Sequence, residues 1–93
     1  MATTNTFVKC EIRSIDAWRF EGAWEWNESF VLESDVYFRE DCVTPRRITA
    51  YLRKLDLLSE SSKGRVRVVN EWPIIEIQDK STGQPVFALL FEE

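Results

Sequence analysis

The chain has 93 residues, of which 44% are hydrophobic and 13% aromatic, and it carries a net charge of −4. This composition is typical of a globular protein, so it argues against disorder and predicts one domain over residues 1–93. The mild negative charge argues against nucleic-acid binding by the whole surface. Because the chain has no histidine and only two cysteines, it can form neither a histidine-activated nucleophile nor an intramolecular zinc site.

The first residues show neither a basic segment nor an apolar run, so no signal peptide is expected. No stretch approaches the ~18 apolar residues of a membrane span. Together these features predict a cytoplasmic protein without membrane contact. In that compartment Cys10 and Cys42 are expected to be free, half-buried thiols. A disulfide between them would require their strands to be neighbours.

The first third of the chain predicts strands. Residues 7–12 alternate between apolar and charged side chains, as in a half-buried strand. Residues 15–26 are the most aromatic stretch, and the natural hairpin turn within them is Glu21-Gly22. A two-residue loop there would place Arg19 opposite Trp24, within reach of a cation–π contact. The register stays open, because the first of these two strands could instead form a longer loop.

Two further segments precede the most regular part of the chain. Residues 29–33 contain three consecutive apolar residues, which predicts a short strand. Residues 35–43 are ambiguous: their β-branched and aromatic residues favour extended structure, whereas their acidic residues could cap a short helical turn.

One helix is predicted, over residues 45–58. Thr44 is a suitable N-cap, and Pro45 fits the first helical position because its missing N–H would have no partner there. Serines and Gly64 follow the segment and predict its end. An apolar stripe at spacings of three and four comprises Ile48, Tyr51, Leu52, Leu55 and Leu58.

Three more strands are predicted after the helix, over residues 65–69, 74–78 and 86–91, the last nearly all apolar and therefore central. Residues 79–85 predict a turn, with Asp79 at its start. The order β-β-β-α-β-β-β predicts an α+β fold, with an antiparallel sheet of about 4–6 strands packed against one amphipathic helix.

Charge is unevenly distributed along the chain. Residues 9–41 contain four basic and nine acidic side chains, a net charge of −5, whereas residues 45–69 carry +5. Ordinary solvated surface explains such charges most simply. The alternative is that one half is a recognition surface, either a basic patch for phosphate or an acidic protein, or an acidic surface that occupies a basic groove.

Two candidate surfaces follow. The four tryptophans fit core and sheet packing, but one or two could remain exposed as interface anchors, where tryptophan and arginine are enriched. The candidate interaction surface comprises Arg19, Trp24, Glu25, Trp26 and Glu28. The candidate basic patch comprises Arg46, Arg47, Arg53, Lys54, Lys63, Arg65 and Arg67.

No catalytic constellation is found in the sequence. The glycines are isolated and form no phosphate-binding loop, and adjacent acids are expected in an acidic chain. We therefore expect no enzyme, no cofactor and no metal site.

Three blocks of the chain, Gly22–Phe30, Leu58–Val66 and Asp79–Leu89, resemble small uncharacterised proteins carried by phages and mobile elements. The resemblance implies a setting rather than an activity, since small acidic proteins in that setting are often inhibitors of host defence machinery.

The sequence leaves three hypotheses. The first is a non-catalytic interaction module, an anti-defence (anti-CRISPR-like) inhibitor that binds a nucleic-acid-handling host protein through its acidic, aromatic half. The second is direct nucleic-acid binding through the basic patch. The third is a structural homodimer that pairs exposed strand edges.

Overall fold

The computed structural model describes residues 6–59, 61 and 64–92. Two long strands come first, followed by a short 3-10 helix, one α-helix and three shorter strands. The elements are β1 (Phe7–Phe20), β2 (Ala23–Arg39), η1 (Glu40–Cys42), α1 (Pro45–Lys54), β3 (Val66–Glu71), β4 (Ile74–Asp79) and β5 (Pro85–Phe91).

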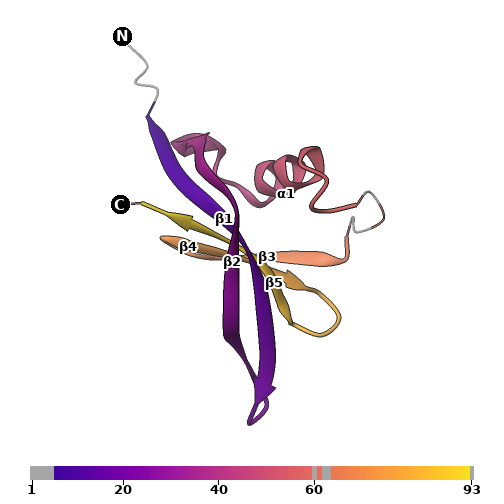
Figure 1. Cartoon of the computed structure of the whole chain (residues 1–93). Helices are drawn as coiled ribbons and strands as arrows, with labels where there is room; N and C mark the ends of the chain where they lie inside the picture. Colours follow the sequence, from indigo (N-terminus) through magenta and orange to yellow (C-terminus); the bar gives the residue numbers. More distant parts are fainter. Residues whose placement is uncertain (1–5, 60, 62–63, 93) are drawn as a thin grey trace.

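The five strands form one antiparallel sheet in the order β2-β1-β5-β4-β3, and α1 lies against one face of it (Figure 1). This arrangement confirms the predicted α+β fold with one sheet and one helix. It also confirms that the apolar C-terminal strand, β5, is central. No helix in the described part of the chain is long and apolar enough to cross a membrane.

Two strands precede α1, where the sequence suggested three, because β2 runs without a break to Arg39. It has 17 residues against the 14 of β1, and the pairing absorbs the difference in three single-residue register shifts. Such bulges bend and twist a strand without ending it. The segment of residues 35–43 realises both of its predicted conformations, since it is extended to Arg39 and then forms η1.

The helix begins as predicted and ends earlier. The Thr44 hydroxyl accepts a hydrogen bond from the backbone N–H of Arg47, and Pro45 is the first helical residue. The last helical residue is Lys54 rather than Leu58, and Asp56 then adopts a positive φ of 61°. Leu58 nevertheless remains buried, so the predicted apolar stripe continues into the turn beyond the helix.

The core lies between α1 and the face of the sheet that it covers. Ile48 and Leu52 of the helix are almost fully buried there. The aromatic ring of Phe38 contacts Tyr51 edge-on, with centroids 5.3 Å apart. The sheet side of this core comprises Cys10, Ile12, Val36, Phe38, Ile75, Ile77, Leu89 and Phe91.

Both predicted turns are present. Glu21 and Gly22 connect β1 to β2 with φ values of 51° and 83°, the conformation of a type I′ hairpin turn. In the turn between β4 and β5, the Asp79 carboxylate accepts hydrogen bonds from the backbone N–H groups of Ser81 and Thr82. Gly83 follows with a φ of 79°.

Candidate functional site

The β1–β2 hairpin extends beyond the rest of the sheet. The last residue of β1 that pairs with β5 is Ser14, opposite Phe87. Beyond it the two strands continue as a two-stranded ribbon, which is the lower part of the hairpin in Figure 1. We call residues 15–29 the arm; all of them are described. A two-stranded ribbon has no third strand beside it, so its stability depends on what its two faces contact.

Cross-strand pairing divides the arm's side chains between two faces, since paired residues lie on the same face of a sheet. Arg19 pairs with Trp24, as predicted from a two-residue turn, whereas Trp18 pairs with Glu25. One face, the anchored face, carries Ile15, Ala17, Arg19, Trp24 and Trp26. The other, the acidic face, carries Asp16, Trp18, Phe20, Glu25 and Glu28.

On the anchored face, Trp24 reaches the turn between β4 and β5. Its Nε1 donates a hydrogen bond to the backbone carbonyl of Thr82 at 3.0 Å. A Cβ atom at Gly83 would lie 3.8 Å from the indole ring, which is ordinary contact distance. The Arg19 guanidinium lies 5.6 Å from the Trp24 ring centroid, which confirms the predicted cation–π contact.

Trp26 anchors the same face of the arm to β4. Its Nε1 donates to the Glu76 carboxylate at 3.1 Å, and Gln78 donates to the other oxygen of that carboxylate. Glu76 lies beside Ala88 in the sheet, on the face that α1 leaves uncovered, and Ala88 is nonetheless fully buried. The two tryptophans of the anchored face are therefore half-buried structural contacts.

On the acidic face, no hydrogen bond to another part of the sheet, like those of Trp24 and Trp26, is found among the described residues. Trp18 and Phe20 are 55% and 53% exposed. The carboxylates of Asp16, Glu25 and Glu28 are exposed beside them, and none of the arm's residues on this face is basic. The acidic face is therefore a strip of aromatic rings and negative charge that no other element of the described chain covers.

Two acidic residues lie directly opposite each other on this face. Asp16 pairs with Glu28 across the ribbon, and like charges at such positions destabilise a sheet. The amide Nδ2 of Asn27, the extra residue at the neighbouring bulge, donates to Asp16 at 3.2 Å. Asn27 offers a dipole rather than a positive charge. No ion pair to either carboxylate is found among the described residues.

The structure thus divides the predicted interaction surface between two faces. Arg19, Trp24 and Trp26 belong to the anchored face, and Glu25 and Glu28 belong to the acidic face. Trp18 and Phe20 are the exposed aromatic residues beside those acids, and the sequence reasoning missed them. The sequence could have indicated them. If Arg19 pairs with Trp24, then Trp18 pairs with Glu25, and alternation along the strands places this second pair on the opposite face.

The predicted basic patch is also divided. Arg46, Arg47 and Lys54 are exposed on α1. Arg53 is half-buried, and its Nε has no hydrogen-bond partner in the described part of the structure. Arg67 lies on the sheet face opposite α1, where it donates to Gln78 at 3.2 Å.

The two remaining members of the basic patch lie in the connection between α1 and β3. Arg65 is exposed and directly precedes β3. Lys63 lies outside the described residues. The helix residues and Arg67 therefore face different sides of the molecule and form no single surface.

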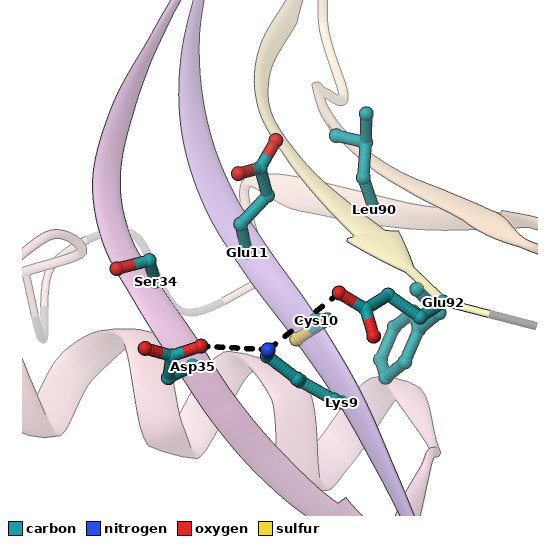
Figure 2. A pocket seen from close by; sticks show the side chains of 8 residues that line it. Lys9, Cys10, Glu11, Ser34, Asp35, Leu90 and Glu92 are labelled. Carbon is teal, nitrogen blue, oxygen red and sulfur yellow. Dashed lines mark ion pairs between the residues drawn. The ribbon is translucent and has the colours of Figure 1, made fainter.

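A pocket of about 310 Å³ lies between the end of β5 and a bulge in β2 (Figure 2). Lys9 Nζ is 2.8 Å from Asp35 and 3.7 Å from Glu92. The hydrogen bond to Asp35, followed by the charges of Asp35 and Glu92, raises the pKa of Lys9 above its ordinary value. The ammonium group therefore stays protonated and paired, which does not suit a general base.

The buried thiol of Cys10, which lines this pocket, does not suit a nucleophile either. Burial, with a smaller contribution from the charge of Glu11, raises the pKa of Cys10 to about 12. Almost none of this thiol would be thiolate at neutral pH. Within residues 6–59, 61 and 64–92, no three metal-ligating side chains gather at one point.

Comparisons with models of protein families, with curated proteins and with solved structures find no match to this chain. The case for a function therefore rests on the arm and on the surfaces described above.

Proposed function

We propose that the protein is a non-catalytic interaction module whose acidic face binds the basic groove of a nucleic-acid-handling host protein. The observation that carries this proposal is the exposure of Trp18 and Phe20 among three carboxylates. Exposed tryptophan is typical of the anchor residues of protein interfaces. Carboxylates around such an anchor complement the lysine and arginine side chains that line nucleic-acid-binding grooves.

The opposed carboxylates of Asp16 and Glu28 support the same proposal. Their repulsion lowers the stability of the free arm. A partner's cation placed between them would remove the repulsion and gain an attraction, so the same pair that weakens the free protein would favour the complex.

Occupation of such a groove would exclude nucleic acid from it. With the resemblance of the chain to proteins of phages and mobile elements, this competition supports the role of an inhibitor of host defence machinery. The proposed mechanism requires only binding, and no group of the arm needs to react.

Affinity capture from bacterial lysate, with and without nuclease, tests this function. The variant Glu25→Lys/Glu28→Lys reverses charge on the acidic face. The control Glu40→Lys/Glu71→Lys changes the net charge by the same amount at two exposed residues outside the arm. Trp18→Ala removes the central aromatic ring and leaves the charge unchanged.

The proposal predicts one stoichiometric protein partner that survives nuclease, is kept by the control and is lost by both arm variants. The captured partner should bind nucleic acid, and the wild-type protein should displace that nucleic acid. Capture that disappears with nuclease would instead favour nucleic-acid binding by the basic residues. Equal capture by the wild type and both arm variants would exclude the acidic face as the binding surface.

A further inference from the structure

A groove lies between the edge of β2 and α1, at the end of the β1–β2 hairpin opposite the arm. It holds about 400 Å³. The helix contributes one stripe to it, Arg47, Ala50, Tyr51 and Lys54, at the spacings of three and four that share a helix face. The strands contribute Phe7, Tyr37, Phe38 and Arg39, and η1 contributes Cys42.

On the side away from β1, the edge of β2 along this groove has no neighbouring strand among the described residues. Glu40 N–H donates to the Thr6 carbonyl at 2.8 Å, which fixes residues 6 and 40 as a hydrogen-bonded pair. Hydrogen-bonded and non-hydrogen-bonded pairs alternate along antiparallel strands. The N–H and C=O groups of Tyr37 and Arg39 therefore point away from β1, toward the open edge of the sheet. The register here is free of bulges from Cys10 to Phe7.

The walls of the groove are cationic and aromatic. Arg47 and Lys54 are exposed and have no ion pair within the described part of the chain. Arg39 is held by Asp41 at 2.8 Å. Phe7 and Tyr37 are 56% and 60% exposed, and none of the described lining residues is acidic.

We propose that this groove binds an extended acidic peptide segment of a partner protein, which adds to β2 as a sixth strand beside α1. Strand addition to a sheet edge takes its affinity from main-chain hydrogen bonds and its specificity from pockets for alternate side chains. The outward groups of Tyr37 and Arg39 supply both donors and acceptors. The phosphate oxygens of a nucleic-acid backbone only accept hydrogen bonds, so phosphate contacts alone would leave the outward C=O groups unmatched.

Charge defines the class of peptide. Arg47 and Lys54 lie one helical turn on either side of the small residue Ala50, where the helix leaves room for an incoming chain. Carboxylates of the peptide would meet these two cations, and its alternate side chains would contact Phe7 and Tyr37. The site is separate from the acidic face of the arm, and its binding does not depend on the function proposed for that face.

A library of random peptides displayed on phage, selected against the full chain, tests this site. Selected peptides are then synthesised and titrated by fluorescence polarisation. Arg47→Glu/Lys54→Glu reverses the charge of the groove, and Ala50→Trp fills it. Arg46→Glu, which makes half of that charge change, is the control, since Arg46 is exposed on the same helix but does not line the groove.

We expect peptides in which acidic and apolar residues alternate. The charge-reversal variant and Ala50→Trp should each weaken their binding at least about tenfold, whereas Arg46→Glu and Trp18→Ala should change it by less than about twofold. N-methylation of alternate peptide amides should abolish binding, and the bound peptide should slow hydrogen exchange at Tyr37 and Arg39. Because every substituted residue is exposed, circular dichroism should show that each variant is folded. If Ala50→Trp is unfolded, the test of the groove uses the charge-reversal variant alone.

Three results would overturn the proposal. The first is a selection that enriches no peptide above an unrelated protein, and the second is an affinity that neither groove variant changes. The third is groove-dependent binding of a different ligand in place of a peptide, either oligothymidylate or a second copy of this chain detected by sedimentation. Loss of the arm's partner in the Trp18→Ala variant, with peptide binding intact, would show that the two sites are independent.

Discussion

The two ends of the β1–β2 hairpin use the same strands in opposite ways. Near α1, the hairpin buries Cys10, Ile12 and Phe38 beneath the helix. In the arm, the same alternation places Trp18 and Phe20 on the continuation of that face, where no helix of the described chain covers them. The difference shows that burial in this chain is decided by the layer above the strand and not by how apolar the strand is.

This comparison separates residues that stabilise the fold from residues that remain exposed. The anchored face of the arm belongs to the first group, because Trp24 and Trp26 donate hydrogen bonds to the turn after β4 and to β4 itself. The acidic face belongs to the second group. The predictions below test that separation, from the largest expected effect to the smallest.

The two thiols should differ most. Cys10 is 2% exposed and has a pKa of about 12. At pH 8, its reaction with Ellman's reagent in the folded protein should be at least about a thousandfold slower than that of an ordinary thiol. Cys42 is half-buried and lines the groove between β2 and α1. Its thiol should react with the reagent at a rate close to that of an ordinary thiol. Two fast thiols without denaturant would contradict the buried position of β1 beneath α1.

Leu52→Ala should strongly destabilise the core between α1 and the β1–β2 hairpin. Leu52 is fully buried under the sheet, and truncation of such a residue costs about 2–5 kcal/mol. Trp18→Ala removes a larger side chain from the uncovered face and should change the free energy of unfolding by less than about 0.5 kcal/mol. Urea unfolding of both variants measures the contrast. Similar losses in the two variants would mean that the acidic face is packed.

Trp26→Ala should lower the free energy of unfolding by less than Leu52→Ala does and by more than Trp18→Ala does. It removes a half-buried ring and leaves one oxygen of Glu76 without its donor, so we expect a loss of about 1–3 kcal/mol. Hydrogen exchange should rise first in the arm, at residues 15–29, because no third strand of the described chain pairs with it. An unchanged exchange rate there would show that Trp26 does not hold the arm against the sheet.

The smallest effect concerns the turn that receives Trp24. Hydrogen bonds from the Ser81 hydroxyl and from the backbone N–H groups of Ser81 and Thr82 lower the pKa of Asp79 below its ordinary value. Its stabilising contribution is therefore present above the ordinary carboxyl pKa and is lost as the pH falls through the lowered one. Asp79→Ala should reduce the melting temperature slightly at pH 7. The difference from wild type should vanish in strong acid, and a difference that persists there would contradict this assignment.

Much of the fold was predictable because its signals are local. Thr44 and Pro45 mark the start of the helix, and Glu21-Gly22 supplies the positive φ values that its turn requires. The end of the helix was not predictable, because Leu58 keeps its place in the core after the helix has ended. The single long β2 was missed because a bulge lets a strand continue through a segment that reads as irregular.

The candidate site was only partly predictable for a related reason. Alternation assigns residues to faces, and it correctly pairs Arg19 with Trp24. Which face of the arm is covered depends on the tertiary contacts of Trp24 and Trp26. Their hydrogen-bond partners lie 58 and 50 positions further along the chain. No local pattern encodes those contacts. The groove beside α1 likewise arises from the packing of a helix against a strand edge.

One variant tests the central claim most directly, because the account predicts opposite signs for two of its properties. Glu28→Lys replaces the repulsion with Asp16 by an attraction, so the free energy of unfolding should rise by about 0.5 kcal/mol. Capture of the nuclease-resistant partner should fall in the same variant, because a cation would then face the partner's cations. A variant that is more stable and no longer binds is the predicted result. If Glu28→Lys captures the partner as well as wild type does, the acidic face of the arm is not the binding surface.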